Sequence, residues 1–229
     1  MSSVSLQASR RTLAGDVYES LRSEILTCRI EPGSKIRIND LCSQMGVNLG
    51  AVREALSKLS SEGLVTAEAQ KGFRVAPVSR QELVDLTSTR VDIEHLCLTD
   101  AIACGDVVWE SQIVASLHHL SRLPERDLED PARLSESWVV AHGAFHLALV
   151  AACKNAVKMR IRASLYDQSE RYRRLSVPAR GHSRRDTLAE HKAIAEAVLG
   201  RDLSRSTELM ASHLNKTTEI LLAAPFLEA

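Results

Sequence analysis

Apolar residues recur every three or four positions along most of this chain, which is the spacing of amphipathic helices. The first such stripe, made by Leu13, Val17, Leu21 and Ile25, predicts a helix over residues 13–28. A Glu-Pro-Gly turn follows and ends it. The chain therefore opens with a helix that has one apolar face for packing.

Two shorter helices joined by a tight turn are predicted next, after a possible strand at 35–38. Asn39 is expected to cap the first of them, and Gly46 to close it. The second begins near Gly50 and stops at Gly63. Its apolar face follows the i, i+3, i+4, i+7 spacing and consists of Val52, Ala55, Leu56 and Leu59.

Two β-like runs, 64–68 and 73–76, flank the residues 69–72, which read as the tip of a hairpin. Two helices around a tight turn, followed by a hairpin, predict a winged helix-turn-helix. The segment Pro77-Val78-Ser79 then breaks the pattern.

Helical periodicity continues to the end, and no strand pattern appears after Pro77. Helices are expected near 80–104, 106–121, 132–153, 156–175, 184–200 and 202–222. The predicted fold is mainly α, with a winged helix-turn-helix at 1–76, a linker at 77–79 and an all-α antiparallel helical bundle at 80–229.

Composition narrows the function only a little. Lys+Arg and Asp+Glu both total 29, and residues 1–76 hold ten basic and eight acidic side chains, which is weak support for nucleic acid. Aromatic residues make up 3%, too few for a protein that stacks single-stranded bases. The five cysteines form no CxxC pair, and neither a signal peptide nor an apolar run long enough for a membrane span occurs. We expect a cytoplasmic protein without a membrane partner.

The polar face of the second helix of the pair is the candidate for reading the major groove of DNA. Arginine can fork onto guanine, and asparagine or serine can serve base edges or phosphates. The wing tip would approach the DNA backbone or minor groove. The predicted contacts are Asn48, Gly50, Arg53, Ser57, Lys58, Lys71 and Gly72. The alternative is a small structural helix-turn-helix with a solvated polar face.

The order of several motifs resembles the GntR family of regulators. The matching segments are Glu31-Pro32-Gly33, Gly46-Val47, Val52-Arg53-Glu54-Ala55-Leu56, Gly63-Leu64-Val65 and Gly72-Phe73-Arg74-Val75. Many members carry Ser-Arg-Thr-Pro where this chain has Asn48-Leu49-Gly50-Ala51. An arginine common before the second helix is Asn39 here, which joins the predicted DNA contacts. The family's operator sequences therefore do not carry over.

Histidines gather on otherwise apolar helix faces in the second part. His142 and His146 are one turn apart and share a face. His191 and His213 lie on apolar stripes of two further helices. A single inward histidine is usually a hydrogen-bonded core residue, but four of them favour a metal site. Both interpretations remain open from spacing alone.

These histidines also resemble those of the FadR-type ligand-binding domain of GntR regulators. The resemblance implies a helical bundle around a cavity that often holds a divalent metal on three histidines and one aspartate. His146, His191 and His213 match the three histidines, and His142 stands at the aspartate position. Loss of the carboxylate should favour Zn²⁺ or Ni²⁺ over Mg²⁺ or Mn²⁺. The alternative is that no metal binds.

Arg90 shares an apolar stripe with its neighbours, and an inward arginine is costly unless paired. Glu94, one turn on, offers a structural ion pair. The family resemblance instead implies an arginine that lines the cavity and binds an effector carboxylate, with Arg162 and Tyr172 as further candidates. The whole segment 154–185 holds ten basic and two acidic residues, and most of it is expected to be a solvated face or dimer contact.

The resemblance thus predicts a homodimeric, ligand-responsive transcription regulator on double-stranded operator DNA. We expect a repressor released by a small carboxylate. One rival is a metal-dependent hydrolase that uses the four histidines, but no HExxH pattern, nucleophile elbow or phosphate loop is present. The other is a structural DNA-binding protein without a ligand.

Overall fold

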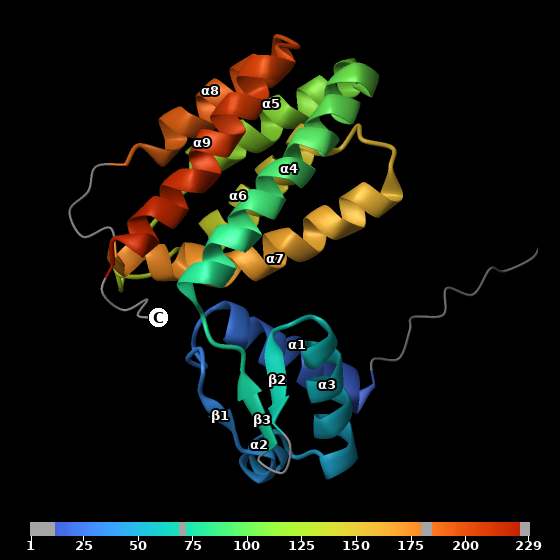
Figure 1. The fold of residues 1–229 in the computed structure, drawn as a ribbon, viewed down its shortest axis with the longest axis vertical. Coiled ribbons are helices and arrows are strands. Elements are labelled where there is room, and N and C mark those ends of the chain that lie inside the picture. The colour runs from blue at the N-terminus through green and yellow to red at the C-terminus, as the bar shows by residue number, and fades with distance from the viewer. Residues whose placement is uncertain (1–11, 69–71, 180–184, 225–229) are drawn as a thin grey trace, which may run out of the picture. The chain divides into compact units, whose positions relative to one another are not determined.

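The first helix begins where a threonine can satisfy one of its free amide groups. Thr12 precedes α1 (Leu13–Leu26), and its hydroxyl accepts a hydrogen bond from the backbone N–H of Gly15 at 3.1 Å. The computed structural model describes residues 12–68, 72–179 and 185–224 (Figure 1). Backbone contacts divide the chain into two units, Met1–Pro77 and Val78–Ala229.

Helices and a small sheet form the first unit around one aliphatic core. The elements after α1 are β1 (Lys35–Ile36), α2 (Ile38–Met45), α3 (Leu49–Ser61), β2 (Val65–Glu68) and β3 (Gly72–Val75). Leu21, Ile25, Leu56 and Leu59 are almost completely buried in that core. Each such side chain stabilises the unit by about 1.5–3 kcal/mol relative to exposure. The predicted winged helix-turn-helix is confirmed.

The sheet has the strand order β1-β3-β2, and both pairings are antiparallel. Val65 pairs with Val75 and Glu68 with Gly72, so β2 and β3 form the predicted hairpin. The residues of its tip, 69–71, lie outside the described part of the chain. Gly72 has φ +93°, a conformation that favours glycine, where the second strand begins.

The start of α2 differs from the prediction. The helix begins at Ile38, and Arg37 precedes it without a side-chain capping bond. Asn39 was predicted to be the cap of this helix, but it is the second residue of the helix. The end was predicted correctly: Gly46 adopts the left-handed conformation at φ 64°, and its N–H bonds to the carbonyl of Cys42.

The second unit is an antiparallel helical bundle, as expected. Its helices are α4 (Arg80–Cys104), α5 (Val107–Ser121), α6 (Glu136–Val150), α7 (Ala156–Ala179), α8 (Thr187–Leu199) and α9 (Leu203–Leu222). α4 packs along α9 and against α7, while α8 lies beside α9 (Figure 1). Phe145, Leu149, Ile194 and Met210 lie in the main core between these helices.

Two helix limits in this unit were predicted wrongly. α6 starts at Glu136, because the residues before it form a turn closed by a bridge between Arg126 and Leu134. α7 runs past the predicted break and includes Pro178 in its last turn. A proline there removes only one hydrogen bond, so the helix can continue for one more residue.

No helix in the described part of the chain is long and apolar enough to cross a membrane. The five cysteines are all free thiols, and Cys97 and Cys153 are the buried ones.

Candidate functional site

The outer face of α3 carries the predicted DNA-reading side chains. Val52 and Leu56 are fully buried on its inner face, whereas Arg53 and Ser57 are exposed on the opposite side. The second helix of a helix-turn-helix presents this exposed face to the major groove. Arg53 is thus placed where its guanidinium can reach a base edge.

The N-terminus of α3 depends on Asn48. Its Oδ1 accepts a hydrogen bond from the backbone N–H of Ala51 at 2.9 Å, so this oxygen serves as the helix cap. A Cβ at Gly50 would lie 3.2 Å from the same oxygen, which is a tight contact. The cap uses only the side-chain oxygen of Asn48, and contact of its side-chain nitrogen with DNA stays a prediction.

The other predicted contacts are spread more widely. The Nζ of Lys58 lies 3.6 Å from the centre of the Tyr18 ring on α1, a cation–π contact. Asn39 on α2 and Gly72 at the start of β3 are exposed. Lys71 lies outside the described residues. A DNA role for each of these residues stays a prediction.

The second unit brings together all four predicted metal ligands. His142 and His146 come from α6, His191 from α8 and His213 from α9. Each is at least nine-tenths buried, and one nitrogen of each lies within 4.8 Å of the corresponding nitrogens of the others. The Nε2 atoms of His142 and His146 are 3.2 Å apart. We call this group the histidine cluster.

Hydrogen bonds outside the histidine cluster fix two of the rings. The Nδ1 of His142 lies 3.1 Å from the hydroxyl of Tyr166, and the Nδ1 of His213 lies 2.8 Å from Oε2 of Glu190. Glu190 is itself bound by Arg185 at 2.7 Å. These partners engage the outer nitrogens, which leaves Nε2 of both rings directed at the cluster's interior.

All four histidines are held in the neutral form. Burial lowers the pKa of His142, His146 and His191 well below the ordinary value, and the neighbouring imidazoles lower it further. Burial also lowers the pKa of His213 to about 4, although the hydrogen bond to Glu190 opposes the shift. A neutral imidazole is the form that binds a metal ion.

The cluster fits a divalent metal. Both ring nitrogens of His191 and Nδ1 of His146 are buried and have no hydrogen-bond partner within residues 12–68, 72–179 and 185–224, which is costly unless something else binds them. Nitrogen ligands about 2.0–2.1 Å from one Zn²⁺ lie within about 4.2 Å of one another, so the cluster needs only a small contraction. Its all-nitrogen donor set suits Zn²⁺ or Ni²⁺.

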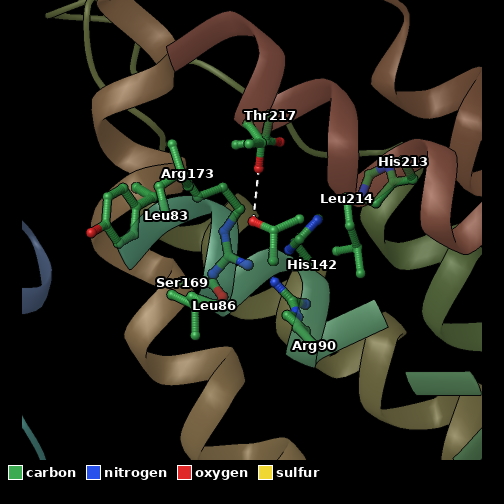
Figure 2. Close-up of a pocket in the computed structure, with 12 residues that line it drawn as sticks. Leu83, Leu86, Arg90, His142, Ser169, Arg173, His213, Leu214 and Thr217 are labelled. Carbon is green, nitrogen blue, oxygen red and sulfur yellow. Dashed lines mark hydrogen bonds between the residues drawn. The ribbon is translucent and has the colours of Figure 1, made fainter. Parts of the chain in front are cut away.

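A small cavity opens onto the histidine cluster. It has a volume of about 30 Å³ and lies between α4, α6, α7 and α9 (Figure 2). Its walls are Leu83, Leu86, Thr87, Arg90, His142, Ser169, Tyr172, Arg173, His213, Leu214, Thr217 and Thr218. The hydroxyls of Thr87 and Thr218 are 2.7 Å apart and join α4 to α9. This volume holds about one water molecule, so a larger ligand must displace side chains.

Arg90 lines this cavity and also lies beside Glu94, whereas its contact with an effector stays a prediction. Its Nε lies 3.7 Å from Oε1 of Glu94, which is an ion pair too long for a hydrogen bond. The Nε and Nη2 atoms of Arg90 are buried and have no hydrogen-bond partner in the part of the chain that the structure describes. Burial lowers the pKa of Arg90 to about 10, so the guanidinium stays charged at neutral pH.

Arg162 and Tyr172 are positioned differently from Arg90. Arg162 donates from Nε to Glu94 at 2.8 Å and from Nη2 to the carbonyl of His146 at 2.8 Å, and it does not line the cavity. Tyr172 lines the cavity, but its hydroxyl donates to Glu82 at 2.7 Å and accepts from the N–H of Ser79. Arg162 therefore joins α7 to α4 and to α6, and Tyr172 joins α7 to the start of α4.

Two family models match these two units. Residues 13–75 match the model for bacterial regulatory proteins of the gntR family, and residues 85–216 match the FCD domain. The chain belongs to the GntR family.

Regulators in the same family are similar over almost the whole length. A GntR relative from Paraburkholderia xenovorans, an uncharacterized HTH-type transcriptional regulator BphR, is 39% identical over 93% of this chain and 87% of its own. The HTH-type transcriptional repressor GlaR from Escherichia coli is 37% identical over 87% of this chain and 91% of its own. This GntR chain is a DNA-binding transcription regulator and not an enzyme, so the hydrolase alternative is set aside.

Solved structures share the fold. The structure of E. coli McbR/YncC superposes with a TM-score of 0.71 and 17% sequence identity. The superposition covers 92% of this chain and 97% of the McbR/YncC chain. A putative GntR regulator from Rhodococcus sp. RHA1 covers 92% and 98% at a TM-score of 0.71 and 20% identity.

Arg173 is a charged cavity residue of this GntR protein that was not predicted from the sequence. Arg173 is buried and lines the cavity, although the basic run around it was expected to be solvated or a dimer contact. Arg171 of the same run is buried too, so that expectation was wrong for Arg171 and Arg173. The available signal was helical spacing, because Arg173 lies on the stripe of Arg162, Tyr166 and Ser169.

Proposed function

We propose that this regulator is a homodimeric repressor whose helical unit binds a small carboxylate and then releases the operator. The observation that carries this proposal is the cavity beside the histidine cluster, into which Arg90 brings buried guanidinium donors that lack a partner. A carboxylate matches the fork of such a guanidinium. The effector we favour is a C4–C6 dicarboxylate or a related hydroxy acid.

The metal is the second part of the proposal. His142, His146, His191 and His213 would hold one divalent ion, with Zn²⁺ or Ni²⁺ favoured. Such an ion supplies positive charge and an open position for an anionic oxygen when it is bound. His142 and His213 also line the cavity, which supports a ligand that reaches both the histidine cluster and Arg90.

The size of the cavity supports a ligand-driven change of shape. A dicarboxylate is much larger than 30 Å³, so its entry has to move side chains of α4, α7 and α9. A ligand shifts an equilibrium only if it prefers one of the two arrangements. A cavity that must open for binding provides that preference.

The repressor and dimer assignments rest on the relatives and on symmetry. The relative GlaR is named as a repressor. Helix-turn-helix proteins bind inverted repeats as two-fold dimers, so one chain would read one half-site. Sedimentation of the purified protein should give the mass of two chains.

The test begins with an operator selected from random duplexes, which should be an inverted repeat. Gel shifts are then titrated with C4–C6 dicarboxylates and hydroxy acids. We expect at least one of these compounds to release the operator. Arg90→Met keeps the apolar stem of the side chain, and it should bind that effector about tenfold or more weakly than the wild type. Arg160→Met, at an exposed position of α7, is the matched control. Release only by a neutral sugar or a purine would overturn the carboxylate assignment.

A further inference from the structure

Arg173 brings a second guanidinium to the wall of the cavity, besides that of Arg90. Arg90 comes from α4 and Arg173 from α7, and both line the space beside His142 (Figure 2). Arg173 is 8% exposed, and its Nε and Nη1 atoms have no hydrogen-bond partner among the described residues. Two buried guanidiniums thus line the same small cavity, and each has N–H donors that are not used in hydrogen bonds to the described residues.

Both of these cations contact the ring of Tyr166. The guanidinium carbon of Arg90 lies 4.9 Å from the ring centre, and that of Arg173 lies 4.5 Å from it. Cation–π contacts of this kind orient a guanidinium but use none of its N–H donors in hydrogen bonds. The donors therefore stay available to a ligand.

Nearby carboxylates do not occupy all of the N–H donors of Arg90 and Arg173. Glu170 contacts Nη2 of Arg173, but it also accepts a hydrogen bond from Nε of Arg174 at 2.8 Å. On the other wall, Glu94 is bound at 2.8 Å by Arg162 and lies farther from Arg90. Each carboxylate is thus shared between two guanidiniums, so positive charge at the cavity is only partly offset.

We propose that Arg173 is a second anion-binding residue of this cavity and that, with Arg90, it makes the site selective for an effector with two carboxylates. This inference rests on the proposed function, since it assigns a residue and a selectivity to the same cavity. One carboxylate lies toward the histidine cluster, and the other bridges the guanidiniums of α4 and α7. A monocarboxylate of equal length cannot make the second set of bonds.

The pair of arginines also carries an electrostatic cost that a dianion removes. Burial is the main reason why the pKa of Arg90 falls to about 10, and the charge of Arg173 lowers it further. Like charges in a low-dielectric space repel strongly. A bridging carboxylate turns this repulsion into two charge-assisted contacts.

Calorimetric titration of the 229-residue protein as purified tests the inference. Succinate, glutarate and adipate are compared with butyrate, pentanoate and hexanoate, and inorganic phosphate serves as a generic anion. In the wild type, the best dicarboxylate should bind about tenfold or more tightly than the monocarboxylate of the same length. Arg173→Met should abolish this preference, because the second carboxylate loses its charge-assisted hydrogen bonds. Monocarboxylate binding should change by less than about threefold, because a monocarboxylate does not make those bonds.

The controls separate the possible failures. Arg160→Met should behave as the wild type. Circular dichroism checks that Arg173→Met is folded, since Glu170 still accepts a hydrogen bond from Arg174 in that variant. Preference for dicarboxylates that survives in Arg173→Met would overturn the inference and leave the proposed function intact. Phosphate binding as tight as the best dicarboxylate would also overturn it. If no carboxylate of the series binds the wild type, the proposed function itself fails.

Discussion

Oε2 of Glu190 lies 2.8 Å from Nδ1 of His213, and the two residues come from neighbouring helices of the bundle. Burial alone would raise the pKa of Glu190, but hydrogen bonds from His213 and Arg185 outweigh burial and hold that pKa well below its ordinary value. Glu190 therefore stays ionised and keeps the proton of His213 on Nδ1. Nε2, the nitrogen facing the histidine cluster, is then free to bind.

A first prediction follows for Glu190→Gln. Loss of the charge should weaken Zn²⁺ binding about 10- to 100-fold, because a carboxylate behind a histidine ligand fixes its tautomer and raises its basicity. Competition with a chromophoric chelator measures the affinity. Glu196→Gln, at an exposed position of the same helix, should leave it unchanged. Equal Zn²⁺ affinities in the two variants would argue against a metal on His213.

The choice of metal can be tested at His142. His142→Asp replaces a nitrogen donor by a carboxylate, and hard oxygen donors suit Mn²⁺ and Mg²⁺ better than imidazole does. We expect the ratio of Mn²⁺ to Ni²⁺ affinity to rise about tenfold or more. Metal analysis after dialysis against equimolar ions measures the ratio. An unchanged ratio would remove His142 from the coordination shell.

The metal-free protein should lose stability in mild acid. The folded-state pKa values of the clustered histidines lie below the unfolded value, and that of His213 is about 4. Their contribution is thus complete above the unfolded pKa and is lost as the pH falls below about 6.5. Each histidine that stays neutral should lower the free energy of unfolding by about 1.4 kcal/mol per pH unit in that range.

Urea denaturation in EDTA between pH 7.5 and pH 5 measures this slope. His191→Gln should flatten it, because one buried imidazole no longer titrates. His95→Gln, at an exposed position of α4, is the control and should keep the wild-type slope. A slope that His191→Gln leaves unchanged would mean that these imidazoles are not held neutral.

Operator binding should depend on Arg53. Arg53→Ala should cost about 1–3 kcal/mol and relax the base preference at one position of each half-site. The side chain is exposed on α3, so the substitution should leave the fold intact. Gel-shift titrations against the selected operator and single-base variants provide the measurement. Arg29→Ala, exposed outside the helix pair, is the control, and full-strength binding by Arg53→Ala would contradict the predicted contact.

Tyr172 should connect the cavity to the start of α4. Its ring lines the cavity, whereas its hydroxyl bonds to Glu82 and to Ser79, the N-cap of α4. Tyr172→Phe keeps the ring and removes both bonds. We expect effector affinity within about threefold of the wild type, since only one neutral cavity contact changes, but weaker release of the operator at saturating effector. Calorimetry and gel shifts measure the two effects separately, and normal release would show that these bonds do not transmit the signal.

The sequence predicted the fold well because amphipathic periodicity determines which face of each helix is buried. The four histidines were found for the same reason, since each continues an apolar stripe. Helix starts were less predictable: Asn39 is a good capping residue by type, yet α2 begins one residue before it. The start of a helix depends on where the preceding strand can pair, which local sequence does not specify.

The arginines of α7 show what periodicity cannot give. Arg171-Tyr172-Arg173-Arg174 has the appearance of a solvated charge run, and the buried partners that stabilise it are not evident locally. Arg162 was predicted at the cavity, but Glu94, 68 residues earlier, binds it instead. Pairings of this length depend on tertiary packing.

One aromatic contact makes the histidine cluster accessible to fluorescence spectroscopy. The indole of Trp138 stacks on the imidazole of His142, with ring centres 4.6 Å apart and planes inclined by 23°. The only other tryptophan, Trp109, donates its Nε1–H to the carbonyl of Ala148 and is covered by Arg201. Emission from Trp138 is therefore sensitive to anything that changes the charge or electronic state of His142. In a Trp109→Phe background, the protein carries its own single-fluorophore reporter of what occupies its interior.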